Sequence, residues 1–283
     1  MPGWSHRLLR SGEFRLDAGA MFGMIPRVVW TKWLQPDEHN RMTLQQNSLL
    51  LERDDRLVLI EVGIGDKMSE KERSLYAQDT RTIRDALHEA DCSPEDIDAV
   101  VLTHLHFDHA GGLTHVDGDG KTVPTFPNAE VIVQQREWDD AIANRSTMHK
   151  TYLPSHLTPE IAERLTLVEG EEEIMPGMWV IPTPGHTWGQ QCIAFEDDRS
   201  DAHTPRHTCF VSDVMPTHWH NRPTSNMAYD VEPYTSMQSR VELLRRASEG
   251  AWRLALVHEP GEALRVPVAD EKRQGEYVLE PAG

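Results

Sequence analysis

The residues best suited to chemistry form one short string, HLHFDHAGG, at positions 104–112. His104 and His106 are two residues apart, so in an extended backbone their side chains point to the same side and can grip one metal ion. Asp108 and His109 follow where the chain has to turn, which can direct them at a second ion nearby. The two glycines that end the string permit the tight backbone path that such a turn needs.

Three more side chains of metal-binding type stand singly, each just after a predicted strand or turn. They are His186, Asp213 and His258. Together with the string they supply five imidazoles and two carboxylates, which suit a borderline ion such as zinc. A lone histidine is more often a satisfied core or surface residue. Three imidazoles and an acid so close together would be costly to bury without metal, so the metal interpretation is favoured.

Short apolar runs that alternate with helical patterns have to position these side chains. The strand predicted at 97–103 runs directly into the string, and strands at 208–212 and 254–257 end just before Asp213 and His258. Further strands are predicted at 48–52, 57–62, 130–134, 179–182 and 191–195, and helices at 80–90, from Arg136 onward and at 233–248. Strands in two groups with helices between them predict a layered α/β sandwich.

The helix predicted at 233–248 is amphipathic, and Met237, Val241 and Leu244 mark its expected apolar face. No repeat and no obvious linker interrupts the pattern. A chain of 283 residues is near the upper size for one hydrophobic core, so we expect one domain over residues 1–283.

Composition limits the partners. The net charge of −18 excludes nucleic acid as an expected ligand, because phosphate binding needs a basic surface. The apolar stretch 18–30 is broken by Pro26 and Arg27, is too short for a membrane span and lacks the order of a signal peptide. Three scattered cysteines predict neither a disulfide framework nor a cysteine zinc site. We expect a cytoplasmic protein that acts on a small molecule away from membranes.

The spaced pattern of His104, His106, Asp108 and His109, followed by His186, Asp213 and His258, resembles the metallo-β-lactamase superfamily over about residues 45–260. The resemblance implies a four-layer αββα sandwich with the site at one edge of the two sheets. It implies one metal held by His104, His106 and His186, a second held by Asp108, His109 and His258, and Asp213 as a bridge. Zinc is the favoured ion, with iron, manganese and cobalt as alternatives.

The resemblance also implies a mechanism. A hydroxide that bridges two ions, formed because the metals lower the pKa of water to about 7, attacks a carbonyl or phosphoryl centre. Asp108 is the expected catalytic residue, since it can orient the hydroxide and pass its proton to the leaving group. Where the superfamily usually carries an aspartate before the histidine string, this chain has Glu61, which we expect to keep the acceptor role.

Within the superfamily, the chain is most similar to the branch of N-acyl homoserine lactonases and methyl parathion hydrolase-like enzymes. The N-terminal segment 18–41, with Met21, Phe22 and Trp30, is predicted to line the pocket or to form a dimer contact. This predicts a quorum-quenching-type lactonase, which opens a lactone or ester with an apolar tail. A phosphotriesterase or organophosphate hydrolase that uses the same site is the alternative.

One departure concerns the substrate. Homoserine lactonases of this branch place a tyrosine three residues after the bridging aspartate, where this chain has Pro216. His218, His220 and Tyr229 are the candidates to supply a donor, and we count them as predicted pocket residues. Five other histidines lack ligand spacing and are predicted to lie at the surface or behind the ligands. They are His115, His149, His156, His203 and His207.

Overall fold

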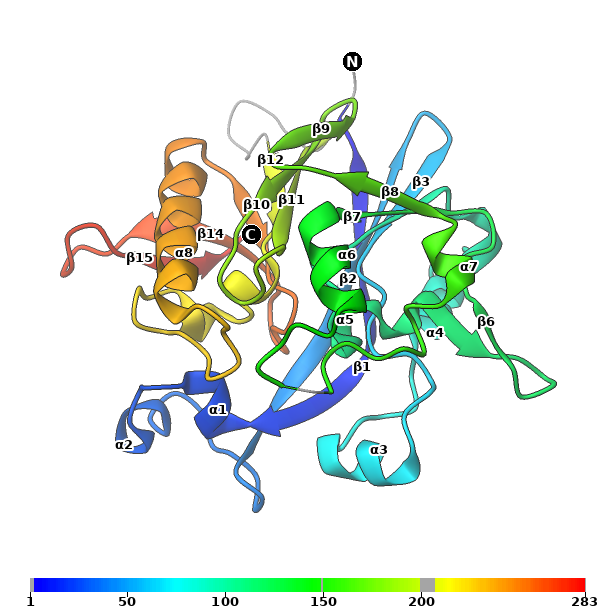
Figure 1. Ribbon diagram of the computed structural model, residues 1–283. Coiled ribbons are helices and arrows are strands. Elements are labelled where there is room, and N and C mark those ends of the chain that lie inside the picture. The colour runs from blue at the N-terminus through cyan, green and yellow to red at the C-terminus, as the bar shows by residue number, and fades with distance from the viewer. Residues whose placement is uncertain (1–2, 149, 199–206, 283) are drawn as a thin grey trace.

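Two β-sheets packed face to face form the centre of the molecule, with helices on the outer side of each (Figure 1). The computed structural model describes residues 3–148, 150–198 and 207–282, so His149 and His203 lie outside the described residues. Strand order is β1-β2-β3-β4-β7-β8 in the first sheet and β15-β14-β13-β12-β11-β10-β9 in the second. The predicted αββα sandwich is therefore confirmed.

The first sheet is built from the N-terminal half of the chain. Its strands are β1 (Ser5–Asp17), β2 (Arg41–Arg53), β3 (Arg56–Ile60), β4 (Ala99–Val101), β7 (Glu130–Gln134) and β8 (Leu165–Val168). The second sheet comprises β9 (Glu172–Met175), β10 (Met178–Pro182), β11 (Gln191–Glu196), β12 (His207–Phe210), β13 (Arg253–Ala255), β14 (Leu264–Ala269) and β15 (Tyr277–Pro281). A small hairpin pairs β5 (Thr114–Val116) with β6 (Thr122–Pro124).

Most helices are short. They are α1 (Ala18–Phe22), α2 (Arg27–Trp30), α3 (Glu70–Tyr76), α4 (Ile83–Glu89), α5 (Phe107–Ala110), α6 (Gln135–Ile142), α7 (Pro159–Ala162) and α8 (Pro233–Glu249). Single 3₁₀ turns occur at η1 (Pro94–Asp96), η2 (Gly111–Leu113), η3 (Ser212–Val214) and η4 (His218–His220). Helix α4 begins three residues later than predicted because Thr82 caps it, with its amide and hydroxyl both 2.8 Å from an Asp85 oxygen.

Side-chain alternation explains why the sheets stack. In β2, Leu49 and Leu51 enter the apolar layer between the sheets, whereas Leu50 enters the layer under α4. Val58 in β3 joins the inner layer in the same way, and Phe195 meets it from the second sheet. Strand β4, whose Ala99 and Val101 belong to this inner layer, ends just before the string of residues 104–112, so the core fixes the base of the site.

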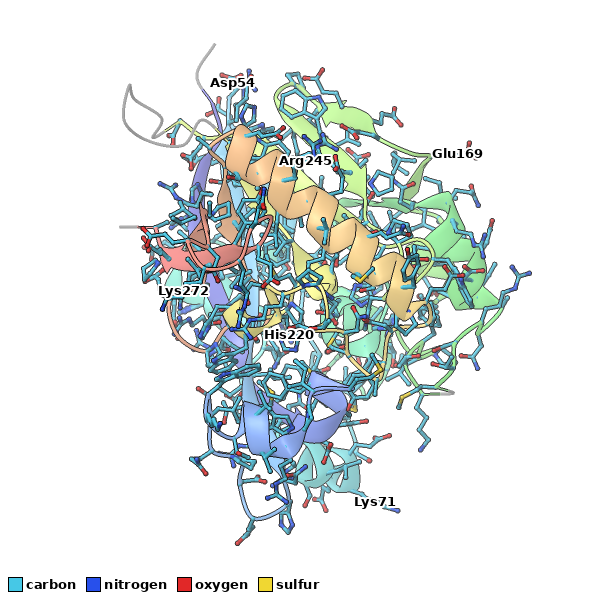
Figure 2. All side chains as sticks on the ribbon, turned by 90° about the vertical axis from the view of Figure 1, so that its left-hand side faces the viewer. Asp54, Lys71, Glu169, His220, Arg245 and Lys272 are labelled. Carbon is cyan, nitrogen blue, oxygen red and sulfur yellow. The ribbon has the colours of Figure 1, made fainter. Side chains whose placement is uncertain are left out.

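Helix α8 covers the outer face of the second sheet, and Figure 2 shows it lying across that face with Arg245 on its outer side. Its buried face consists of Ser236, Arg240, Leu243, Leu244 and Ala247. The predicted face is wrong for Val241, which is 38% exposed. The reason is that buried Arg240 occupies this face and donates to the carbonyl of Val214 (2.7 Å), next to a candidate ligand.

Among the described residues, seven strands have no counterpart among the predicted elements. These are β1, β5, β6, β8, β9, β14 and β15. Strand β1 pairs with β2 along its length, with a shift in register between Arg10 and Glu13. Across the described ranges, no helix combines the length and apolar character needed to cross a membrane.

Candidate metal centre

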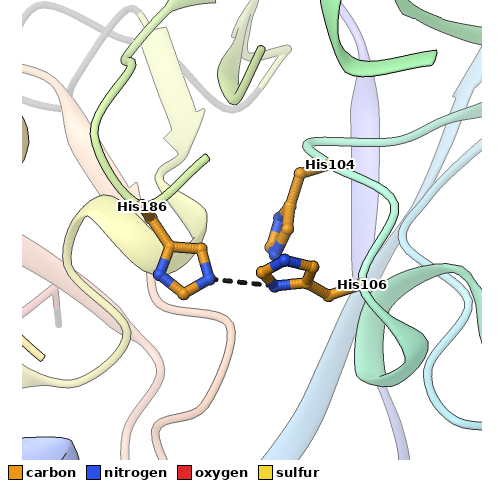
Figure 3. Close-up of side chains that lie close together, drawn as sticks. All are labelled: His104, His106 and His186. Atoms are coloured by element: carbon orange, nitrogen blue, oxygen red, sulfur yellow. Dashed lines mark hydrogen bonds between the residues drawn. The ribbon is translucent and has the colours of Figure 1, made fainter. Parts of the chain in front are cut away.

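Four segments bring the seven candidate ligands together just after strands of both sheets. His104, His106, Asp108 and His109 follow β4, His186 follows β10, Asp213 lies in η3 after β12, and His258 follows β13. Each of the seven is at most 8% exposed. Figure 3 shows His106 and His186 meeting across the site, with His104 beside them, and the facing ring nitrogens of the first two are 3.1 Å apart.

The ligand atoms of these residues form three groups, each with all atoms within 4.8 Å of one another. The groups are His104, His106 and His186; His104, His109 and Asp213; and Asp108, His109 and His258. The first and third groups are the two ligand sets that the family resemblance implies. The second group overlaps both, so the three together make one continuous cluster.

Asp213 lies between the two implied metal positions. Its Oδ2 atom is 3.3 Å from His186 Nε2 and 3.5 Å from His109 Nε2. Its Oδ1 atom is 3.3 Å from His258 Nε2. One carboxylate therefore faces imidazoles of both sets, which is the geometry that a bridging ligand requires.

Several buried polar atoms in the cluster have no hydrogen-bond partner. They are the Nε2 atoms of His104, His106, His109 and His258, and Oδ1 of Asp213. Buried polar atoms in proteins are nearly always paired, so a convergent set of unpaired ones needs an explanation. Nitrogen and carboxylate lone pairs that lie close together in such groups suit divalent cations, and this donor set fits zinc. The residues present therefore fit the metal centre that the family implies.

In two of the candidate ligands, the ring nitrogen that faces away from the cluster is held by a hydrogen-bond acceptor. His186 Nδ1 lies 3.0 Å from Asp230 Oδ1, and His258 Nδ1 lies 2.9 Å from the carbonyl oxygen of Gln45. When Nδ1 donates to such an acceptor, the Nε2 lone pair is left free to face the cluster. These partners thus set the tautomer that metal binding needs.

Glu61 serves His109 in the same way. Its Oε2 contacts His109 Nδ1, and its Oε1 accepts a hydrogen bond from the Thr103 amide (2.7 Å). Glu61 and Ser212 both adopt left-handed backbone, with φ of 66° and 51°. Such conformations cost about 1–3 kcal/mol in non-glycine residues and persist where the surroundings enforce them. Here they direct Glu61 and the neighbouring Asp213 toward the cluster.

The electrostatics of the cluster favour positive charge at its carboxylate side. Burial lowers the pKa of His104 and of His106 well below the ordinary value, which keeps both rings neutral, as metal ligation requires. Burial opposes the charged form of His109 too, but Glu61, Asp213 and Asp108 outweigh it and raise its pKa well above the ordinary value. Burial likewise opposes ionised Asp213, yet the surrounding imidazoles hold its pKa well below the ordinary value.

The glycines at the end of the string are required by close approach. A Cβ atom on Gly111 would lie 2.2 Å from the carbonyl oxygen of Ile64, and one on Gly112 would lie 2.1 Å from that of Val62. Both carbonyls belong to the turn after β3, which carries Glu61. Glycine therefore lets the turn that holds His109 pack directly against the segment that orients it.

Gly185, which precedes His186, is a position where we expect substitution to lower the stability of the protein. Its φ is +133°, and an added Cβ would lie 2.2 Å from the amide nitrogen of Ser236 in α8. We expect Gly185→Ala to lower the free energy of unfolding by about 1–3 kcal/mol through overpacking. Urea denaturation of Gly185→Ala measures it. Gly118→Ala is the matched control, because nothing lies within 4 Å of its Cβ position. Equal stability of the two variants would contradict the prediction.

A cavity with about 630 Å³ of empty space, its open mouth included, opens directly on the cluster. Its wall is formed by Leu16, Met21, Tyr76, His106, Phe107, Asp108, Ser146, Met148, Thr151, His186, Asp213, Met227, Tyr229 and His258. Of the predicted pocket residues, Met21 and Tyr229 lie in this wall. A second hollow outside it shares Leu16, Tyr76 and Tyr229, so these three side chains separate an inner from an outer space.

Phe22, Trp30 and His220 do not line the cavity, which corrects the prediction for these residues. The Phe22 ring stacks on Trp30, with centroids 5.5 Å apart, and on His220 at 5.3 Å. All three are at most 2% exposed. The His220 ring is held further by Nε2, which lies 2.9 Å from the carbonyl oxygen of Met21. Their aromatic surfaces pack on one another, so they support the pocket wall from behind.

His218 is also corrected, because it does not line the cavity either. Its Nδ1 atom lies 2.7 Å from Glu259 Oε2, so its ring is directed toward the segment that follows His258. Asp230 is a site residue that sequence reasoning missed. It follows Tyr229 in a stretch with no recognisable motif, and its partner His186 is 44 residues away. No local signal marks such a long-range pair.

Known proteins resemble this chain in sequence. The family model of the Metallo-beta-lactamase superfamily matches residues 41–200. An N-acyl homoserine lactonase from Bacillus thuringiensis is 33% identical over 141 residues, which are 50% of this chain and 46% of that protein. The chain thus spans about half the length of the curated relatives it matches.

Solved structures resemble it over nearly the whole chain. A probable metal-dependent hydrolase from Staphylococcus aureus has 28% identity and a TM-score of 0.85, covering 99% of this chain and 98% of that one. AidC, a dizinc quorum-quenching lactonase in complex with a product, has 19% identity and a TM-score of 0.78, covering 100% and 96%. The second likeness concerns the fold alone. By its sequence match and by its cluster of histidines and aspartates, the chain belongs to the metallo-beta-lactamase superfamily.

Proposed function

We propose that this protein is a dinuclear, metal-dependent lactonase that opens a lactone, or cleaves a related ester, bearing an apolar tail. One observation carries the proposal: a largely apolar cavity opens directly on the cluster, and five of the seven candidate ligands lie in its wall. The names of its relatives agree with this, since they include N-acyl homoserine lactonases. The preferred ions are two Zn²⁺, because imidazole and carboxylate are the ligands that zinc takes in hydrolytic sites.

The chemistry divides between the ions and the chain. Bound divalent ions would supply an acidic water, with a pKa of about 7, and Lewis acidity toward the substrate carbonyl. Asp108 lies in the cavity wall and is positioned to accept a proton from the attacking water. The same carboxyl group can then protonate the alkoxide that leaves when the ring opens.

The cavity wall sets the substrate class. Leu16, Met21, Phe107 and Met227 present apolar surface beside the ligands, which suits an acyl chain. Tyr229 is the one of the three candidate donors that lies in this wall, so its phenol is the proposed polar contact for the substrate. That the segment 18–41 also contacts a second copy of the chain stays a prediction. Met24 and Val28, 82% and 74% exposed, are the residues to test there.

Tail length gives a quantitative test. Burial of each methylene contributes about 0.8 kcal/mol, so kcat/KM should rise about fourfold for each methylene added to the acyl tail until the cavity is filled. Zinc-loaded protein assayed against N-acyl homoserine lactones of increasing tail length measures this. A flat profile would contradict an apolar tail site, and failure to open any lactone or ester would refute the lactonase proposal.

The phosphotriesterase alternative is tested in the same assay with paraoxon. Both reactions would use the same ligands, so only relative turnover separates them. The lactonase proposal expects the value of kcat/KM for the best lactone to exceed that for paraoxon. The opposite order would favour the alternative.

A further inference from the structure

The peptide between His104 and His106 is held from both sides by buried side chains. The Leu105 amide donates to Glu137 Oε1 (2.9 Å), and the Leu105 carbonyl lies 3.1 Å from His156 Nε2. Glu137 and His156 are both 0% exposed. Neither belongs to the cluster of ligands, and His156 was predicted only as one of several residual histidines. Both hydrogen-bonding groups of one peptide are therefore fixed.

Glu137 also ties this peptide to the segment that carries the third histidine. Its Oε2 atom accepts a hydrogen bond from the Thr187 hydroxyl (2.6 Å), directly after His186. Its Oε1 atom accepts a second bond, from the Tyr152 hydroxyl (3.0 Å), and the Tyr152 ring lies 5.0 Å from the ring of His106. One carboxylate thus connects two segments that are 80 residues apart at their nearest histidines.

The cost of this arrangement suggests a purpose beyond stability. Among the described residues, no lysine or arginine pairs with Glu137, and burial raises its pKa. Its partners are an amide and two hydroxyls, so burial of the charge is offset by neutral donors only. His156 Nδ1 is buried without a partner, so this ring uses only one of its two nitrogens. Apolar residues would fill the same space without these penalties.

We propose that Glu137 and His156 are positioning residues that fix the distance between the His104–His106 pair and His186, and thereby set the affinity of the first metal position. The proposal rests on the metal centre proposed above. A tetrahedral ion tolerates little displacement of its ligands, so the frame that holds the backbone should matter as much as the rings. Removal of such supporting partners typically weakens metal binding by about 10- to 100-fold.

Helix α6 offers a matched control. Asp140 lies one turn after Glu137 and is also 0% exposed. Its carboxylate oxygens lie 2.6 Å from Arg136 Nε and 3.1 Å from Arg145 Nη1. The side chains of these two arginines are 56% and 61% exposed. Asp140→Ala therefore removes a buried carboxylate from the same helix without touching the histidine segments. A general loss of stability should appear in both Glu137→Ala and Asp140→Ala, whereas loss of metal should appear only in Glu137→Ala.

The experiment measures the transfer of Zn²⁺ from the loaded full-length protein to a chelator. Glu137→Ala and His156→Leu are expected to weaken retention of one ion by about 10- to 100-fold relative to the unmodified chain. Glu137→Gln should largely restore retention, because the amide oxygen can accept from Leu105 and the amide nitrogen can donate to the Thr187 hydroxyl. Asp140→Ala should retain both ions even where its melting temperature falls.

Either of two results would overturn the proposal: unchanged retention in Glu137→Ala, or equal metal loss in Asp140→Ala. If Glu137→Ala does not fold, Thr187→Val removes only the link to the His186 segment and should still speed release. Retention is measured without substrate, so it is separable from the lactonase assignment. If the variants retain zinc as expected but the unmodified chain turns over no lactone, only the lactonase assignment is refuted. If the unmodified chain binds no zinc, both the lactonase assignment and the positioning role of Glu137 and His156 are refuted.

Discussion

Replacing Asp108 with alanine is expected to lower kcat/KM toward lactones by about 10²- to 10⁴-fold, the range for loss of a positioned acid–base group. Asp108 Oδ2 lies 3.5 Å from His258 Nε2 and 3.8 Å from His109 Nε2, so the carboxylate faces both the second ligand set and the cavity. The variant should keep its fold, because Asp108 projects from the short helix α5 into the site. Steady-state kinetics at saturating zinc and circular dichroism measure the two effects.

Asp108→Asn separates metal binding from proton transfer. The amide keeps the shape and one oxygen ligand but cannot carry the proton, so kcat should fall even in preparations that hold as much zinc as the unmodified chain. Full activity in either variant would rule out the role assigned to Asp108. Loss of zinc without any further loss of kcat in the remaining loaded fraction would make it a ligand only.

The sequence was sufficient to predict the fold class and to select the residues that cluster. Two local features of the sequence correspond to the cluster in the folded structure. They are the spacing of His104 and His106, and the placement of Asp213 and His258 directly after apolar runs. Their convergence depends on strands whose hydrophobic runs are equally local. This explains why the layered α/β sandwich predicted from the strand pattern agrees with the structure, whereas the four-layer αββα order was implied by the family resemblance.

What the sequence could not predict depends on partners far apart along the chain. Glu137 meets Leu105 and Thr187 at separations of 32 and 50 residues, and no periodicity marks such hydrogen bonds. Aromatic residues pose a related problem: Phe22 and Trp30 are of the residue types that often line pockets, yet their rings stack on each other. Orientation within an apolar cluster is decided by packing, which residue type alone does not specify.

Removal of metal is expected to abolish hydrolysis entirely and to lower the melting temperature. The cluster gathers unpaired nitrogens of four histidines and an unpaired oxygen of Asp213 in a buried site, so the cation would satisfy atoms that otherwise lack partners. A ligand that binds only the folded state stabilises it by about 4 kcal/mol when its free concentration exceeds Kd about a thousandfold. For a chain of this size, that corresponds to a rise of about 7 °C in Tm.

Calorimetry and lactone turnover after chelation, and again after stepwise return of Zn²⁺, test this expectation. Activity should stay absent until the second equivalent per chain if Asp213 bridges two ions, because its carboxylate faces imidazoles of both ligand sets. Recovery that is complete at one equivalent would instead support a mononuclear enzyme. Return of Mn²⁺ or Co²⁺ in place of Zn²⁺ shows how far the same nitrogen and oxygen ligands discriminate between ions. Unaltered turnover in protein shown to be metal-free would leave the clustered histidines without the catalytic role proposed for them.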